Sequence, residues 1–174
     1  MAQTIFTLGH STRSLDSFLA LLREHGVTQV IDVRRFPVSH RHPYFSGEEL
    51  AATLREAGLG YRHEPDLGGR RKASSESRNG GWRAGSFRAY ADYMETTEFR
   101  GALDAVIGDA STEVPVLLCA EAVPWRCHRQ LISDALVARG LAVRHVMGSG
   151  TAPQHSLTRF AQVQEDMTVI YPSD

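Results

Sequence analysis

Strand-sized apolar runs alternate with helical patterns along the chain, and this order constrains the fold more than any other feature. The apolar runs lie at 5–8, 27–33, 114–119 and 142–147. Parallel strands need a crossover connection, which is usually a helix. We therefore predict an α/β fold: a single-domain, three-layer sandwich around a mainly parallel open sheet, with a Rossmann-like arrangement.

The helical segments carry signals at both ends. Ser14 suits an N-cap, apolar residues recur on one face over 15–22, and Gly26 suits the left-handed residue after a helix. Ser46 and Glu49 have the spacing of a capping box. The remaining predicted elements are helices at 46–57, 86–95, 97–110, 127–139 and 157–164, and strands at 60–62 and 168–171.

Residues 66–85 are rich in Gly, Ser and Arg and show no periodicity. A compact domain rarely holds so long an irregular segment unless it is a lid, a binding loop or partly disordered. We predict a mobile loop at 66–85 within one domain that spans 1–174, a length suited to a single core.

The basic residues are unusual in kind and in position. The formal net charge of −1 excludes a polycation that coats nucleic acid. Every basic residue except Lys72 is an arginine, which reflects codon bias or bidentate binding of phosphate and carboxylate. Arginines gather at 33–47 without any acid, and at 62–88 seven basic residues accompany three acidic ones. These two segments predict an electropositive side that attracts an anionic small molecule or a nucleic-acid component.

The apolar runs also bear on location. All of them are too short for a transmembrane helix, so we expect no membrane partner. The first strand begins too early to leave room for a signal peptide. The sequence therefore predicts a cytoplasmic protein.

Polar residues follow three of the predicted strands. His10 and Ser11 follow the first, Asp32 and Arg34 end the second, and Cys119 ends the third. In open parallel sheets, ligands bind outside the carboxyl ends of the strands. These positions predict a site there, although polar residues also resume at strand ends without any functional reason.

The two cysteines lie eight residues apart. Cys119 is a candidate nucleophile or redox thiol, or a small buried hydrophobe, and the neighbouring Glu121 opposes a thiolate. Cys127 is better placed for a lowered pKa, because a helix N-terminus and basic neighbours stabilise a thiolate. A phosphatase-type loop is excluded, since the position six residues after Cys119 holds Trp125 instead of arginine.

A disulfide or a metal site is an alternative for the same cysteines. A stable disulfide is not expected in a reducing cytoplasm. Structural zinc takes four ligands with short paired spacings, and the two cysteines with His128 and a distant His10 reach that number only with an unusual spacing. We predict no metal, and the sequence indicates no particular cofactor.

Four further residues allow two interpretations each. His10 suits proton transfer or an oxyanion contact, or else it bonds a neighbouring loop. Asp32 suits a general base, or else it pins Arg34. Tyr90 and Tyr93 suit base stacking, but at helical spacing we expect them to pack in the core.

Segments spread over nearly the whole chain resemble one protein family. They are Thr7-Leu8-Gly9-His10-Ser11-Thr12, Asp32-Val33-Arg34, Pro37-Val38-Ser39, Leu67-Gly68-Gly69, Phe87, Tyr90, Tyr93, Met94, Leu117-Leu118-Cys119-Ala120-Glu121, Cys127-His128-Arg129 and Gln154-His155-Ser156-Leu157-Thr158. The chain thereby resembles a bacterial and archaeal family catalogued as domain of unknown function 488, with Ser156 where proline is expected. The resemblance implies one intracellular α/β domain with a shared site, and it implies no particular reaction.

The sequence favours an enzyme that acts on an anionic ligand: a phosphorylated small molecule, a nucleotide or a nucleic-acid component. The predicted catalytic residues are Cys119, Glu121, His10 and Asp32, and the predicted ligand-binding residues are Ser11, Arg34, Arg35, Cys127, His128 and Arg129. Two alternatives stay open: a non-catalytic nucleic-acid-binding module that uses both basic segments, and a thiol redox or metal-binding protein.

Overall fold

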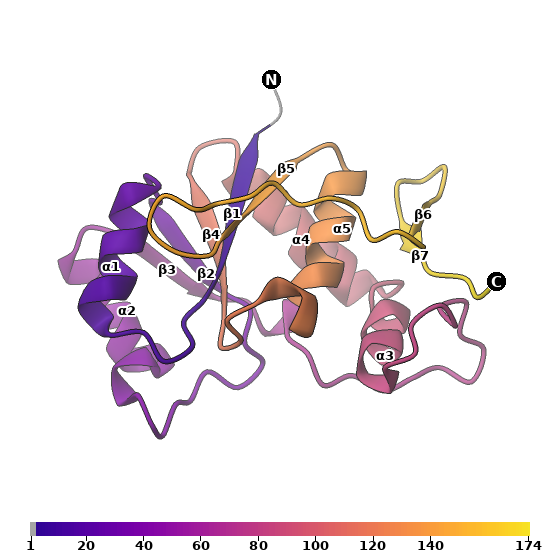
Figure 1. Cartoon of the computed structure of the whole chain (residues 1–174), viewed down its shortest axis with the longest axis horizontal. Helices are drawn as coiled ribbons and strands as arrows, with labels where there is room; N and C mark the ends of the chain where they lie inside the picture. Colours follow the sequence, from indigo (N-terminus) through magenta and orange to yellow (C-terminus); the bar gives the residue numbers. More distant parts are fainter. Residues whose placement is uncertain (1–2) are drawn as a thin grey trace.

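A computed structural model describes residues 3–174 and contains a five-stranded sheet in the order β3-β2-β4-β1-β5 (Figure 1). Every neighbouring pair of strands is parallel, which confirms the predicted parallel α/β fold. The four apolar runs form every strand of this sheet except the edge strand β3. The strands are β1 (Thr4–Gly9), β2 (Gln29–Asp32), β3 (Gly60–His63), β4 (Pro115–Cys119) and β5 (Ala142–Val146).

Helices cover both faces of the sheet, so the predicted three-layer sandwich is confirmed (Figure 1). Helices α1 and α2 lie on one side, and α3, α4 and α5 lie on the other. They are α1 (Leu15–Glu24), α2 (Gly47–Glu56), α3 (Gly85–Tyr93), α4 (Thr97–Asp109) and α5 (Arg129–Ala138).

Strand β4 contributes to both layers of the core. Val116 and Leu118 pack with α1 and α2, whereas Leu117 and Cys119 belong to the cluster that includes α3, α4 and α5. Successive side chains of a strand point to opposite faces, so a strand buried on both sides reads as a continuous apolar run. This places the Cys119 side chain on the α5 side of the sheet.

Of the two predicted helix N-caps, the one at Ser14 is confirmed and the one at Ser46 is wrong. Ser14 Oγ accepts from Ser17 N at 3.1 Å, and Gly26 has a φ of 69°, as expected for the end of α1. Ser46 precedes α2, but the predicted capping box is wrong because no side-chain cap forms there. Ser46 Oγ instead accepts from Ser39 N at 3.0 Å and so ties the loop after β2 to the start of α2.

The predicted helix at 157–164 is also wrong. This segment holds only a two-residue strand, β6 (Gln162–Val163), which pairs antiparallel with β7 (Val169–Ile170). Thr158 explains the difference, because its N–H donates to Asp134 Oδ1 and its Oγ1 accepts from Gln130 Nε2. These bonds hold the segment along α5 in place of helical bonds of its own. The strand expected at 168–171 is present as β7.

The 66–85 segment is irregular, as predicted, after a short 3₁₀ turn at Pro65–Leu67. Its middle is fixed by Asn79, which is fully buried. Asn79 Nδ2 donates to Asp92 Oδ1 at 2.8 Å, and its Oδ1 accepts from Tyr171 N at 2.9 Å. The mobility of the loop at 66–85 stays a prediction.

Within residues 3–174, no helix is both long enough and apolar enough to cross a membrane.

Candidate functional site

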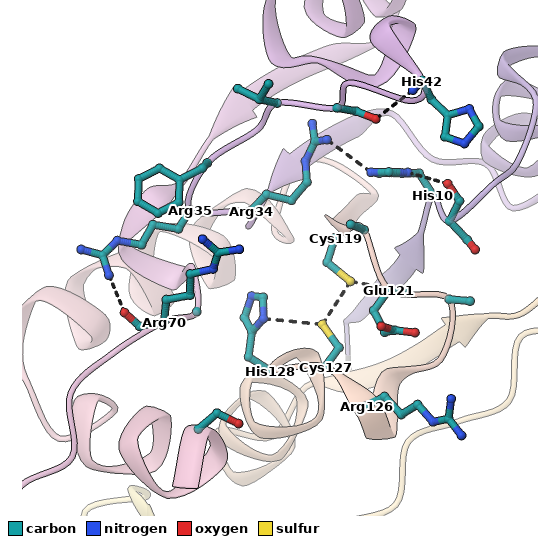
Figure 2. A pocket seen from close by; sticks show the side chains of 18 of the residues that line it. His10, Arg34, Arg35, His42, Arg70, Cys119, Glu121, Arg126, Cys127 and His128 are labelled. Carbon is teal, nitrogen blue, oxygen red and sulfur yellow. Dashed lines mark hydrogen bonds between the residues drawn. The ribbon is translucent and has the colours of Figure 1, made fainter. Parts of the chain in front are cut away.

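A pocket of about 830 Å³ lies at the carboxyl ends of β1, β2 and β4 (Figure 2). It brings together eight of the ten predicted site residues; Asp32 and Arg129 do not line it. The lining residues predicted from the sequence are His10, Ser11, Arg34, Arg35, Cys119, Glu121, Cys127 and His128.

The backbone ladder between β1 and β4 continues into the pocket wall. His10 N donates to Cys119 O at 2.9 Å, and Ser11 N donates to Ala120 O at 3.0 Å. Gly9 is required just before them, since a Cβ at this position would fall 1.6 Å from Glu121 O. The turn after β4 therefore crosses directly over β1, which holds the two walls in register.

Asp32 lies beneath the pocket, where its fully buried carboxylate binds Arg34. Arg34 Nε donates to Oδ1 at 2.8 Å and Nη2 donates to Oδ2 at 2.7 Å, a bidentate pair. Tyr61 donates a further bond to Oδ2 at 2.6 Å, and burial followed by the nearby carboxylate raises the pKa of Tyr61. Of the two interpretations of Asp32, the geometry favours the one in which it pins Arg34.

His10 is occupied at both ring nitrogens. Nδ1 lies 3.0 Å from Ser11 O, and a carbonyl only accepts, so this nitrogen carries the proton. Nε2 then accepts from Arg34 Nη1 at 3.3 Å. Burial is the main cause that lowers the pKa of His10 to about 4, so the ring is neutral at pH 7. Its geometry suits orientation of Arg34 better than proton donation.

The two sulfur atoms meet at the pocket floor, 3.1 Å apart, and both cysteines are free (Figure 2). Cys127 Sγ also accepts from Arg129 N at 3.4 Å and lies 3.5 Å from His128 Nδ1. A hydrogen bond from Cys119, and then the hydrogen bond and charge of His128, lower the pKa of Cys127 well below its usual value. Burial raises the pKa of Cys119, whose Sγ also lies 3.5 Å from Glu121 O, so negative charge is favoured on Cys127 over Cys119.

A backbone carbonyl directly after β2 orients the His128 ring. Its Nε2 lies 3.1 Å from Val33 O, so this nitrogen carries a proton, and Nδ1 is left facing Cys127. Nδ1 is thereby placed 3.5 Å from the Cys127 sulfur, the arrangement in which a histidine activates a cysteine nucleophile by proton exchange.

Arg129, predicted to bind ligand, is completely buried behind the pocket. Its Nη1 donates to Thr7 Oγ1 at 3.0 Å, and its Nη2 donates to Glu121 O at 2.7 Å. The guanidinium thus braces the turn after β4 from below. Its charge also contributes to the lowered pKa of Cys127.

A buried hydrogen-bonded chain, which the sequence analysis missed, continues from Thr7. Thr7 Oγ1 lies 2.6 Å from His145 Nδ1, His145 Nε2 lies 2.8 Å from His155 Nδ1, and His155 Nε2 lies 2.8 Å from Asp134 Oδ1. Tyr171 donates to the other oxygen of Asp134 at 2.8 Å. Burial lowers the pKa of His145 to about 3, which keeps this link neutral. The members are far apart in sequence, so no local pattern reveals them.

Further arginines at the pocket rim were not predicted as site residues, although Arg41 and Arg70 lie in the two arginine-rich segments. Arg41, Arg70 and Arg126 line the pocket and are exposed. Phe36 lines it too with 59% of its surface exposed, and the guanidinium carbons of Arg35 and Arg70 lie 5.5 and 5.8 Å from its ring centre. Tyr90, expected to pack, is buried and donates to Leu67 O.

No group of three or more His, Cys, Asp or Glu side chains in residues 3–174 is arranged to hold a metal ion.

Comparison with known proteins bears on identity but not on chemistry. A search of curated proteins and a search of solved structures gave no significant match. A family model described as "Domain of unknown function DUF488" matches residues 14–136, from the cap of α1 into α5. This match covers well over half of the chain and contains both cysteines, so the chain belongs to the DUF488 family.

Proposed function

We propose that this protein is an enzyme that binds a phosphorylated ligand in the pocket and attacks it with the Cys127 sulfur. The observation that carries the proposal is the composition of the pocket around that sulfur. Five arginines and four histidines line it, against a single acidic residue, Glu121. Such a cleft attracts anions and concentrates them at the reactive group.

Two of these arginines are free to bind a ligand. Arg41 and Arg126 are exposed at the pocket and make no side-chain hydrogen bond, ion pair or cation–π contact within residues 3–174, whereas the Arg70 guanidinium lies over Phe36. Arg34, in contrast, is already held by Asp32. Arginine binds phosphate with paired, charge-assisted hydrogen bonds, which supports a phosphoryl group as the anchor of the ligand.

The cysteine pair supports covalent chemistry with divided roles. Cys127, as thiolate, attacks an electrophilic atom of the ligand, and the leaving group departs with a proton from His128. Water then attacks the intermediate, Glu121 accepts its proton, and the Cys127 thiolate is released. Cys119, the candidate nucleophile from the sequence, instead stays a thiol beside Cys127, because its own thiolate is disfavoured by burial.

Phe36 supports a nucleotide as the ligand in this proposal. A phenyl ring that is 59% exposed at the rim of an arginine-rich pocket offers a stacking surface for a base. Stacking does not depend on the identity of the base, since every base has a π face. A nucleotide would thus place its phosphate among the arginines and its base on Phe36.

Loss of a free arginine is expected to weaken the binding of AMP about tenfold, the effect of removing one charge-assisted hydrogen-bonding group. The variants are Arg41→Gln and Arg126→Gln, and isothermal titration with AMP and with inorganic phosphate measures the affinity. Arg23→Gln is the matched control, because Arg23 is also exposed, in the last turn of α1, and lies outside the pocket. Equal weakening by all three substitutions, or no binding to the wild type, would contradict the proposal.

Replacing Phe36 is expected to weaken the binding of nucleotides but not the binding of sugar phosphates. Phe36→Leu should weaken AMP binding about tenfold and leave ribose 5-phosphate binding unchanged, since only AMP carries a base. Trp125→Leu is the control, because Trp125 is also 59% exposed but does not line the pocket. A loss of the same size for both ligands would show that Phe36 acts on the phosphate site and not on a base.

Catalysis is tested with the nucleotides that bind. Wild-type protein should convert at least one of them, and mass spectrometry should find a transient adduct on Cys127. Cys127→Ser should bind the same nucleotides without converting them. Binding without conversion of any nucleotide is the result expected of a non-catalytic binding module.

A further inference from the structure

We infer that Cys119 and Cys127 form a redox pair that a hydroperoxide converts into an intramolecular disulfide. The inference concerns a modification site, and it holds whether or not the pocket binds a nucleotide. It rests on the distance between the two sulfurs, on their access to the pocket and on the groups around Cys127.

The sulfur atoms are positioned for bond formation. They lie 3.1 Å apart in the reduced protein, and a disulfide bond of about 2.05 Å needs an approach of only about 1 Å. Cys119 is held at the end of β4, paired with Gly9 of β1. Cys127 lies between the turn Pro124–Arg126 and α5, with its N–H donating to Pro124 O and its carbonyl accepting from Gln130 N. Both sulfurs are therefore held close together by ordered backbone.

The pocket gives a small oxidant access to the pair. Both cysteines line it, and Cys127, at 6% exposure, is the more open of the two. Arg129 N and His128 Nδ1 approach the Cys127 sulfur at 3.4 and 3.5 Å, which stabilises negative charge on it. Cys127 is thus the peroxide-reactive sulfur, and Cys119 is the resolving one.

The reaction balances with hydroperoxide as the only oxidant. The Cys127 thiolate attacks one peroxide oxygen, an S–O bond forms, the O–O bond breaks, and the departing oxygen takes a proton and leaves as water or alcohol. Cys119 sulfur then attacks the Cys127 sulfenic acid, the S–S bond forms, and the S–O bond breaks. The expelled hydroxide takes the Cys119 proton as water. The cysteine pair loses two electrons, which the peroxide gains, and a dithiol reductant reverses the oxidation by exchange.

Oxidation would remove the negative sulfur from the pocket floor. Arg129 N and His128 Nδ1 then lose their anionic acceptor, and the proposed nucleophile is masked. A disulfide at this position would therefore switch off cysteine chemistry in the pocket until a dithiol restores it.

The test uses the full-length protein treated with hydrogen peroxide at a few equivalents. The chain has two cysteines, so every thiol signal belongs to this pair. We expect loss of both thiols in a thiol titration, a mass decrease of two hydrogens, a peptide that links Cys119 to Cys127, and full reversal by dithiothreitol. Cys119→Ser should stop at a Cys127 sulfenic acid, which dimedone traps, and Cys127→Ser should react far more slowly.

Two results would overturn the inference. One is wild-type Cys127 that accumulates sulfinic or sulfonic acid without a linked peptide, and the other is a disulfide only between two chains on a non-reducing gel. Circular dichroism of Cys119→Ser and Cys119→Ala checks that both variants fold. AMP titration of the same samples keeps the two proposals apart, because a wild type that forms the disulfide but binds no AMP supports this inference and contradicts the proposed function.

Discussion

Replacing Asp134 by alanine is expected to destabilise the protein by about 3–5 kcal/mol, as the loss of one partner in a buried charged network does. Asp134 is fully buried in α5. Its Oδ1 accepts from His155 Nε2 and Thr158 N, and its Oδ2 accepts from Tyr171 OH. Alanine leaves all three donors unpaired in the interior, and each unpaired buried donor costs about 1–3 kcal/mol. Urea denaturation of wild type and variant measures the difference.

Two further variants show whether the network or the charge alone is responsible. Asp134→Asn keeps one oxygen for His155 and Thr158, so we expect a smaller loss than with alanine. Asp104→Ala removes a carboxylate that is 60% exposed and pairs with Arg139 at 2.9 Å, and a surface pair of this kind contributes less than about 1 kcal/mol. If Asp134→Ala is no more harmful than Asp104→Ala, the buried network does not stabilise the fold.

The fold was predictable where the structure depends on local patterns. The run from Val116 to Leu118 is buried on both faces, which its continuous apolar sequence indicates. The errors arise where a distant partner decides. Thr158 bonds to Asp134 and keeps its segment out of a helix, and Ser46 bonds to Ser39 instead of capping α2. Neither partner can be identified from the neighbouring residues alone.

The location of the candidate site followed from topology, because the carboxyl ends of parallel strands meet at one edge. The surroundings of each side chain could not be predicted from topology. Arg129 stands two residues after Cys127, yet its guanidinium is buried, where it donates to Thr7 Oγ1 and Glu121 O. His10 looked equally suited to proton transfer, but Arg34 occupies its free nitrogen.

The buried hydrogen-bonded chain begins at Arg129, next to Cys127, and ends at Asp134. Arg129 donates to Thr7 Oγ1, so the Thr7 hydroxyl hydrogen points to His145 Nδ1. Each following link donates onward, through His145 and His155, to the Asp134 carboxylate. The chain thus joins the Arg129 guanidinium to the Asp134 carboxylate. The charge of Arg129 contributes to the lowered pKa of Cys127.

The pH dependence of the alkylation rate should show directly whether Cys127 is a thiolate. A thiolate reacts with iodoacetamide and a thiol does not, so the rate follows the thiolate fraction. The pKa of Cys127 lies well below its usual value, so its rate should fall much less steeply from pH 8 to pH 6 than the rate of an ordinary cysteine. An ordinary cysteine, with a pKa of about 8.5, loses nearly tenfold per pH unit over this range. At pH 6 we therefore expect Cys127 to react at least about tenfold faster than an ordinary thiol, of which less than about 1% is thiolate at this pH.

The variants assign this reactivity to one sulfur. Cys127→Ser should abolish alkylation below pH 9, because burial raises the pKa of the remaining Cys119. Cys119→Ala should move the Cys127 profile to higher pH, since the hydrogen bond from Cys119 is the largest cause of the lowered pKa. Peptide mass spectrometry after timed labelling between pH 5 and pH 9 gives each rate. A wild-type rate that rises tenfold per unit from pH 6 to pH 8 would rule out a Cys127 thiolate and the chemistry proposed for it.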